Sequence, residues 1–172
     1  MASGAALSRS LVTLGRVDRA ALVVELGSGT GVVTRHILES CAQGTQLISL
    51  ELDSQLAQET RSRCPRAVVV NEDAQKVREV IERFGHTACD SIVSCIPWAN
   101  ISPSRQRDML DAVDSVLRSG GSFVTFAYVH SARLPNARHF YRELCARYPG
   151  VETSDVIWAN VPPAVVYRVT KV

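Results

Sequence analysis

The sequence ALVVELGSGTG, residues 21–31, decides the fold. Its first half, Ala21–Leu26, is a short continuous apolar run, which is typical of a strand buried on both faces. Its second half is a glycine-rich turn, and residues with the apolar spacing of a helix follow at Thr30–Cys41. A strand, a glycine turn and a helix in this order predict a ligand-binding loop at the carboxyl end of the strand.

The alternation of strand and helix continues along the chain. Further strands are predicted over Gln46–Glu51, Ala67–Asn71, Asp90–Cys95 and Ser122–Val129, and helices over Ser54–Cys64, Ala74–Phe84, Ser104–Arg118 and Asn136–Tyr148. Two closing strands, Val156–Asn160 and Ala164–Thr170, have no helix between them, so they predict an antiparallel hairpin at the edge of the sheet. The pattern predicts an α/β fold with helices on both faces of a mostly parallel sheet. One domain over residues 21–172 follows a short N-terminal helical segment, residues 1–20.

Composition excludes several classes of protein. The chain has 172 residues, 46% hydrophobic and 21% charged, which is enough apolar material for a core and argues against disorder. A net charge of +2 gives no broad electrostatic case for binding nucleic acid or an anionic membrane. None of the five cysteines forms a C-x-x-C pair, so no metal site is expected. Without a signal-peptide core or an apolar run of about 20 residues, the sequence predicts a cytoplasmic protein.

The glycine loop itself discriminates between ligands. Glu25 to Gly31 follows the pattern E-x-G-x-G-x-G, whereas a dinucleotide loop has G-x-G-x-x-G and would need a glycine in place of Val32. No Lys-Ser/Thr pair follows, so the loop is not a Walker loop. This spacing suits a ligand without phosphates, because the backbone can approach an adenosine ribose and Glu25 can serve a cationic amino group.

The segment VVELGSGTG, residues 23–31, resembles the first motif of the class I S-adenosylmethionine (SAM)-dependent methyltransferases. The resemblance extends from about residue 20 to the end, and it implies a Rossmann-like, seven-stranded sheet with an antiparallel last strand. It also implies SAM as cofactor and S-adenosylhomocysteine (SAH) as product. The implied cofactor-binding residues are Glu25, Gly27, Ser28, Gly29, Gly31, Glu51, Leu52, Asp73, Ala74 and Ser94.

Two of these acids follow consecutive strands. Glu51 can accept hydrogen bonds from both ribose hydroxyls, and its alternative is a solvated acid at a strand end. Asp73 is expected to accept from the adenine amino group, although aspartate also favours the N-cap of a helix. Both roles of Asp73 can coexist.

The loop Ser94–Asn100, SCIPWAN, is where related enzymes that methylate amino nitrogens carry a proline loop. Adenine-amino methyltransferases have Asn/Asp-x-Pro-aromatic there, whereas this chain has Cys95, a poor hydrogen-bond acceptor, at the first position. Trp98 is interpreted as a ring for a substrate or cation, or as core packing. Asn100 is interpreted as a head-group contact or a turn residue.

The closing run from Trp158 to Arg168 resembles the last hairpin of bacterial phospholipid N-methyltransferases through N-x-P-P-A-x-V-Y-R, and LRSGGSFVTFAY, residues 117–128, is similar too. The resemblance implies methylation of an amine such as the phosphatidylethanolamine head group. Ser94, Trp98 and Asn160 are then expected to position the acceptor, in a pocket formed by Cys95, Ile96, Pro97, Trp98, Asn100, Tyr128, Asn160 and Tyr167. Arg105, Arg107, His130, Arg133 and Arg138 are cations that follow the neighbouring strands.

Several alternatives stay open. Leu7, Leu11 and Leu14 have helical spacing but form a weak amphipathic face, so the N-terminal segment is expected to pack as a lid or on the sheet rather than in a membrane. The acceptor is therefore a lipid head group, with peripheral contact at the inner membrane surface, or a soluble amine such as a natural product or amino acid. An adenine-N6 methyltransferase of ribosomal RNA and a non-catalytic SAM-binding domain are further alternatives, although no nucleic acid partner is expected. The sequence leaves the oligomeric state open.

Overall fold

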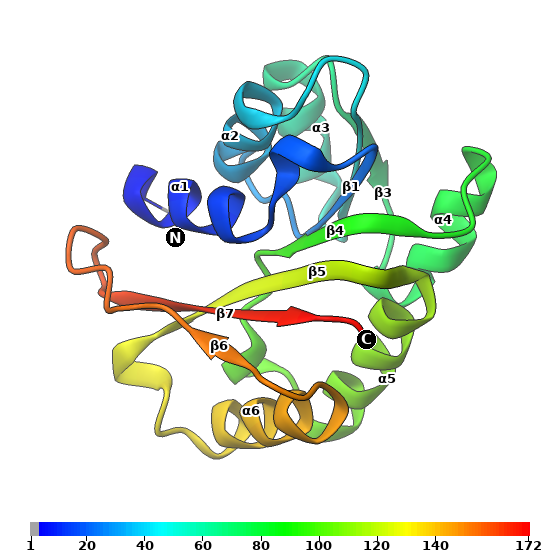
Figure 1. The fold of residues 1–172 in the computed structure, drawn as a ribbon. Helices are drawn as coiled ribbons and strands as arrows, with labels where there is room; N and C mark the ends of the chain where they lie inside the picture. The colour runs from blue at the N-terminus through cyan, green and yellow to red at the C-terminus, as the bar shows by residue number, and fades with distance from the viewer. Residues whose placement is uncertain (1–3) are drawn as a thin grey trace.

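The computed structural model describes residues 4–172, which form a seven-stranded sheet with helices on both faces (Figure 1). The strand order is β3-β2-β1-β4-β5-β7-β6. The strands are β1 (Leu22–Leu26), β2 (Gln46–Glu51), β3 (Val68–Asn71), β4 (Cys89–Ser94), β5 (Leu117–Tyr128), β6 (Glu152–Thr153) and β7 (Ala164–Thr170). Strands β1 to β5 are parallel, whereas β7 is antiparallel to both β5 and β6. The predicted Rossmann-like fold with an antiparallel last strand is confirmed.

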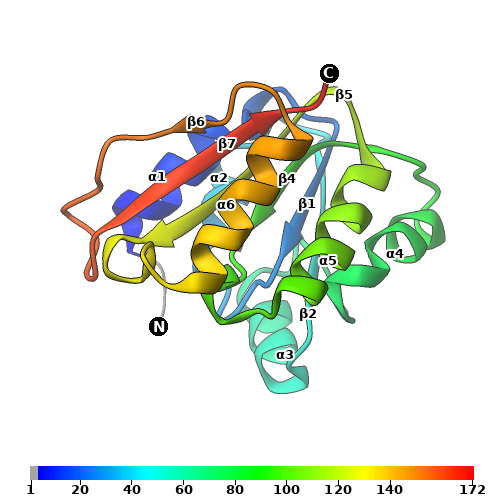
Figure 2. The ribbon, with the colours of Figure 1, turned by 90° about the horizontal axis from the view of Figure 1, so that it is seen from below.

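Three helices cover each face of the sheet (Figures 1 and 2). One face carries α1 (Ala5–Leu14), α2 (Val32–Ser40) and α3 (Ser54–Arg63), and the other carries α4 (Val77–Arg83), α5 (Pro103–Val116) and α6 (Pro135–Arg147). Short 3₁₀ turns lie at Val17–Arg19, Ala74–Lys76, Trp98–Asn100 and Val129–Ser131. No helix in residues 4–172 is long and apolar enough to cross a membrane.

Strand β1 shows why its sequence is apolar without interruption. Leu22, Val24 and Leu26 join the core under α4, α5 and α6, whereas Val23 joins the core under α1 and α2. Successive side chains point to opposite faces of a strand, and both faces of this strand are covered. The order of the strands then brings the carboxyl ends of β1, β2 and β4 side by side, which is where ligands bind in such sheets.

The N-terminal segment packs on the sheet. Leu7 and Leu11 of α1 have no exposed surface and join the core formed with α2, β5 and β7. The main-chain N–H of Gly4 donates to Asn160 Oδ1 over 2.9 Å, which attaches the start of α1 to the loop before β7. The apolar face of α1 is therefore not free to lie in a membrane.

Two predicted elements are wrong. Val156–Asn160 is not a strand: β7 pairs with Glu152–Thr153, and Val156–Asn160 keeps only one isolated bridge, between Ile157 and Ala164. The edge pairing is reinforced by an ion pair between Arg168 of β7 and Glu152 of β6. Helix α5 ends at Val116 instead of Arg118, and β5 begins at Leu117.

The Gly120-Gly121 pair therefore lies within β5. At Gly121 a Cβ would lie 2.7 Å from Leu117 Cδ1 and 3.0 Å from the carbonyl oxygen of Asp90. The strand needs glycine where it crosses its neighbour this closely, which is a common reason for glycine within a strand. The remaining predicted elements differ from the observed ones mainly at their ends.

Candidate functional site

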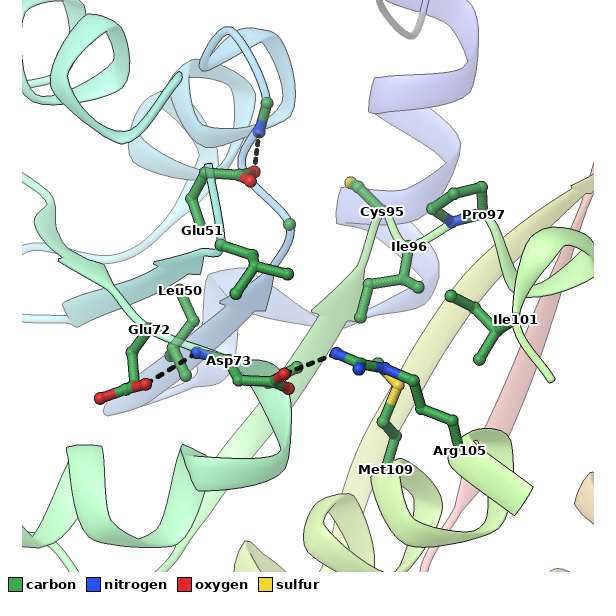
Figure 3. A pocket seen from close by; sticks show the side chains of 14 residues that line it. Leu50, Glu51, Glu72, Asp73, Cys95, Ile96, Pro97, Ile101, Arg105 and Met109 are labelled. Atoms are coloured by element: carbon green, nitrogen blue, oxygen red, sulfur yellow. Dashed lines mark hydrogen bonds and ion pairs between the residues drawn. The ribbon is translucent and has the colours of Figure 1, made fainter. Parts of the chain in front are cut away.

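A cavity of about 270 Å³ opens at the carboxyl ends of β1, β2 and β4 (Figure 3). Its walls come from the glycine loop, the ends of β2 and β3, the loop after β4 and the start of α5. The lining residues are Gly27, Gly29, Leu50, Glu51, Leu52, Glu72, Asp73, Ala74, Cys95, Ile96, Pro97, Ile101, Arg105 and Met109. Most of this surface is apolar, with carboxylates at the β2 and β3 ends.

Two glycines of the loop serve different purposes. Gly29 has a φ of +54° and lines the cavity, and a Cβ built there would meet nothing within 4 Å. Gly31 has a φ of +83°, and its Cβ would lie 3.3 Å from Thr60 Oγ1 on α3. Gly29 thus keeps space open for a ligand, whereas Gly31 lets the loop pack against a helix.

The side chain of Glu51 fixes the glycine loop by a hydrogen bond to its backbone. Its carboxylate is only 9% exposed, and Oε2 accepts a hydrogen bond of 2.8 Å from the N–H of Gly29 while Oε1 accepts one of 3.0 Å from the N–H of Asp53. Each carboxylate oxygen has a second lone pair, so Glu51 can still accept from a ligand in the cavity. Figure 3 shows the bond from the loop to this carboxylate.

Asp73 both caps a turn and reaches across the cavity. Its Oδ1 accepts from the N–H of Gln75 over 2.9 Å, and its Oδ2 pairs with the guanidinium of Arg105 from α5. The N-cap role weighed from the sequence is thus present, and the second carboxylate oxygen faces α5 as well. In Figure 3 the Asp73–Arg105 pair spans the space between the β3 end and α5.

Glu25 lies fully buried beneath the glycine loop and does not line the cavity. Its Oε2 accepts hydrogen bonds of 2.7 Å from Thr34 Oγ1 and from Ser49 Oγ, whereas Oε1 has no partner in residues 4–172. Burial raises the pKa of this carboxyl to about 7, against the lowering effect of the two hydroxyls. A carboxyl in this state is protonated in about half of the molecules at neutral pH.

A second cavity, of about 230 Å³, adjoins the first at Pro97. It lies between the loop after β4, the end of β5, α6 and the loop before β7. Its lining residues are Pro97, Trp98, Ala99, Asn100, Phe126, Ala127, Tyr128, His130, Ser131, Ala137, Phe140, Pro162 and Tyr167. Six of these residues carry aromatic rings, and no aspartate, glutamate, lysine or arginine of the described part of the chain lines the cavity.

Trp98 is chiefly a packing residue. Its side chain is 3% exposed, its ring stacks on Phe140 with centroids 4.3 Å apart, and its Nε1–H donates to Ser94 Oγ and Thr125 Oγ1 over 3.1 Å each. Ser94 is fully buried and lines neither cavity, so its hydroxyl anchors Trp98 instead of a ligand. Only part of the indole forms the wall of the second cavity.

Asn160 departs from its predicted place at the acceptor. It is 2% exposed, accepts from the N–H of Gly4, and donates 2.6 Å from Nδ2 to the carbonyl oxygen of Pro162. Both ends of its amide are satisfied within the protein, and it lines neither cavity. Its role in the structure is to hold α1 and the loop before β7 together.

Comparison with known proteins identifies the family. Residues 23–121, more than half of the chain, match the family described as Methyltransferase domain. The chain belongs to this methyltransferase family. It is also 32% identical over 120 residues to the ornithine lipid N-methyltransferase of Singulisphaera acidiphila. The matched segment covers 68% of this chain and 62% of that protein. The ribosomal RNA small subunit methyltransferase A of Leifsonia xyli subsp. xyli is 32% identical over 65% of this chain and 39% of its own length. The chain thus spans less than two thirds of either curated relative.

Solved structures share the methyltransferase fold. An O-methyltransferase from Bacillus cereus in complex with SAH has a TM-score of 0.73 at 19% identity, with 98% of this chain and 82% of that chain covered. The N-methyltransferase NodS from Bradyrhizobium japonicum WM9 has a TM-score of 0.72 at 14% identity, with 96% and 94% covered. At these identities the likeness establishes the fold of the methyltransferase domain and leaves the acceptor open.

The first cavity of the methyltransferase domain fits SAM, the cofactor of class I methyltransferases. Gly29 leaves open a place that a Cβ would fill, Glu51 keeps free lone pairs for hydroxyl donors, and Leu50, Ile101 and Met109 offer an apolar surface to a flat ring. Of the cofactor residues predicted from sequence, Gly27, Gly29, Glu51, Leu52, Asp73 and Ala74 line this cavity. Glu25, Ser28, Gly31 and Ser94, which the sequence also predicted to bind the cofactor, do not line this cavity.

Sequence reasoning missed several lining residues. Met109 in the first cavity and Ala137 and Phe140 in the second come from helices α5 and α6 and carried no motif. Phe126 and Pro162 lie within the quoted motifs but were not singled out. Gln106 was also missed: it is fully buried, and its Nε2 donates to the carbonyl oxygens of Trp98, Ile101 and Asn136. It thereby fixes the loop after β4 against α6. A polar residue on the apolar face of a helix was the available signal.

The buried carboxyl of Glu25 is expected to make the free energy of unfolding depend on pH. The pKa of Glu25 is about 7 in the folded protein, above that of an exposed glutamate. Between about pH 4.5 and 7, the carboxyl therefore holds its proton in the folded protein and has lost it in the unfolded chain. The free energy of unfolding is therefore expected to fall across this range as pH rises. Glu25→Gln keeps an acceptor for the two hydroxyls without a charge, so it is expected to be near neutral at pH 5 and stabilising at pH 8.

Urea denaturation of the cofactor-free protein at both pH values measures this difference. Glu39→Gln, at an exposed glutamate of α2, is the control and is expected to change stability equally at both pH values. Equal effects of Glu25→Gln at pH 5 and pH 8 would mean that Glu25 is ionised throughout.

Proposed function

We propose that this chain is a class I SAM-dependent N-methyltransferase whose acceptor is an amine, and that the head group of an aminolipid such as phosphatidylethanolamine is the first candidate. The observation that carries the proposal is the second cavity, which joins the cofactor cavity at Pro97 and is walled by aromatic rings without a carboxylate. Such a site favours a group that is neutral when it reacts and cationic afterwards.

The residues of the first cavity hold the methyl donor in this proposal. The loop at Gly27 and Gly29 brings the backbone close to the donor, Glu51 accepts from the ribose hydroxyls, and Asp73 accepts from the adenine amino group. Bound SAM supplies a methyl group activated by a positively charged sulfur and leaves as SAH. The protein supplies no covalent nucleophile, so alignment and exclusion of water are its main contributions.

The second cavity positions the amine. An attacking nitrogen needs its lone pair, and desolvation among Trp98, Phe126 and Tyr128 disfavours the charged ammonium before transfer. After transfer, the aromatic faces of Phe126 and Tyr128 stabilise the methylated ammonium. The released proton leaves towards His130, which lies exposed at the rim and stacks on Tyr128 with ring centroids 5.6 Å apart.

A lipid acceptor is supported by the rim of this cavity. Trp158 is 72% exposed and Val161 is 85% exposed in the loop before β7, and Val129 and Leu134 are exposed in the loop after β5. The two loops touch, because the N–H of Val129 donates to the carbonyl oxygen of Pro163. Exposed apolar residues grouped at a cavity mouth are typical of contact with a membrane or partner. We infer peripheral membrane contact at these loops.

The second candidate is a soluble amine, such as an amino acid or natural-product amine, because the cavity is small and its chemistry requires only the amino group. Methylation of adenine in ribosomal RNA is the third candidate, because one curated relative is a methyltransferase of ribosomal RNA. Against it, Cys95 supplies no strong hydrogen-bond acceptor for an adenine amino group at the junction of the cavities.

The first experiment uses methyl-tritiated SAM, vesicles that contain phosphatidylethanolamine, and a pool of soluble amines. After the reaction, label is partitioned between organic and aqueous phases. Label in the organic phase is expected and identifies a lipid acceptor. Label only in an aqueous product selects the soluble amine, and SAM binding without transfer to any acceptor selects a non-catalytic binding domain.

A further inference from the structure

A groove of about 460 Å³ adjoins the second cavity and lies between α6 and the edge of the sheet at β6 and β7. Ala137 and Tyr167 line both spaces, so the groove and the cavity are neighbours. The other lining residues are Ala132, Arg138, Tyr141, Arg142 and Thr153. Among residues 4–172, no acidic residue lines the groove.

Arg138 and Arg142 stand one helical turn apart on this face of α6, and both are exposed. Neither guanidinium makes an ion pair or hydrogen bond with any residue in the part of the chain that the structure describes. Like charges at this spacing on a helix repel each other, so the arrangement is unfavourable unless an anion lies between them.

The carboxylates on the two elements that border the groove are used elsewhere. Glu143 of α6 pairs with Arg147 and His139, and Glu152 of β6 pairs with Arg168. The two groove arginines thus keep their full charge and their planar donor groups for an external ligand. Paired N–H donors of arginine match the oxygens of a phosphate or carboxylate.

Polar groups from the sheet complete the groove. Thr153 of β6 lies opposite Tyr167 of β7 in the sheet, and the ring centroids of Tyr167 and Tyr141 are 5.1 Å apart. Tyr167 therefore separates a cavity of aromatic rings from a groove of cations. A ligand that spans this residue would place an amine on one side and an anionic group on the other.

We propose that the groove at Arg138 and Arg142 is an anion subsite, and that the acceptor is a zwitterion with a phosphate or carboxylate beside the amine that receives the methyl group. The inference rests on the proposed N-methyltransferase function and deepens it. The subsite selects against amines that carry no anionic group. A phospholipid head group and an amino acid both carry such a group, so both fit the subsite.

Two pairs of small amines test the subsite, and each pair differs by the anion alone. Phosphoethanolamine is compared with ethanolamine, and ornithine with 1,4-diaminobutane. Binding to the protein with SAH is measured by calorimetry, and methyl transfer from SAM gives kcat/KM. The wild-type protein is expected to prefer the anionic member of at least one pair by about 10-fold or more. The pair that shows the preference distinguishes phosphate from carboxylate.

The double variant Arg138→Gln/Arg142→Gln keeps good helix formers and is expected to reduce this preference to about 2-fold or less, with the plain amines unaffected. The control Arg9→Gln/Arg66→Gln removes the same charge from exposed residues outside both cavities and the groove, and it is expected to keep the preference.

Equal binding of both members of each pair to the wild-type protein, or a preference that survives the double variant, would overturn the subsite. Failure of the proposed function has a different signature. If phosphoethanolamine or ornithine binds through the arginines but no amine receives a methyl group, the subsite stands and N-methylation fails. If the plain and anionic amines are methylated equally well, N-methylation stands and the subsite fails.

Discussion

Replacing Gly29 with valine is expected to weaken SAM binding by at least about 100-fold while the protein stays folded. Gly29 lines the cofactor cavity, and a Cβ there would enter space that no protein atom occupies. The added carbon atoms therefore collide with a ligand instead of the protein. Calorimetric titration with SAM and SAH measures the loss, and thermal unfolding without cofactor reports the fold.

The matched control is Gly44→Val. Gly44 also has a positive φ, +91°, and a Cβ there also meets nothing within 4 Å, but it lies in the turn before β2, at the opposite end of the strands. Both substitutions cost backbone strain, so both are expected to lower the melting temperature. Only Gly29→Val is expected to lose SAM. If it bound SAM as tightly as Gly44→Val does, the first cavity would not be the cofactor site.

Trp98→Ala is expected to lower the free energy of unfolding by about 3–5 kcal/mol, because it removes a buried ring from a packed core. The ring stacks on Phe140, meets Phe123 edge-on, and satisfies two buried hydroxyls. The second tryptophan offers the control: Trp158 is 72% exposed, and Trp158→Ala is expected to cost less than about 0.5 kcal/mol. Urea denaturation followed by circular dichroism compares the two.

Trp98→Phe separates packing from hydrogen bonding. It keeps an aromatic ring but removes the N–H that Ser94 and Thr125 accept, and it is expected to cost about 1–3 kcal/mol. If Trp98→Ala were as stable as the wild-type protein and lost only methyl transfer, the indole would be an acceptor-binding group and not a core residue.

Trp158→Ala in turn is expected to reduce sedimentation with vesicles while leaving stability unchanged.

The parts of the fold that could be predicted from sequence are those with local signals. The apolar run at Ala21–Leu26 predicted a strand covered on both faces, and the structure places the apolar side chains of β1 in two different cores. Val156–Asn160 was mistaken for a strand because it is rich in strand-forming residues, yet it forms a loop with Trp158 exposed. The true edge pairing joins Glu152–Thr153 to β7 and is reinforced by the ion pair between Glu152 and Arg168, which no local pattern reveals.

The same distinction applies to the site. The glycine loop and the acids after β2 and β3 follow strands in sequence, so their convergence at one edge could be predicted from topology alone. The contribution of α6 could not be predicted, because Phe140 and Arg142 reach the cavity and the groove only through the packing of that helix against the loop after β4. Asn160 shows the opposite error: a residue within a motif proves to hold two segments of the protein together.

The place of β7 in the sheet has a consequence for synthesis on the ribosome. Residues 164–170 form hydrogen bonds with β5 on one side and β6 on the other, and α1 packs on them as well. A nascent chain that lacks them exposes the long edge of β5 and leaves the apolar face of α1 without part of its support. Helix α1 therefore completes its packing only after residues 164–170 have been translated, and the exposed strand edge and apolar face call for a chaperone in that interval.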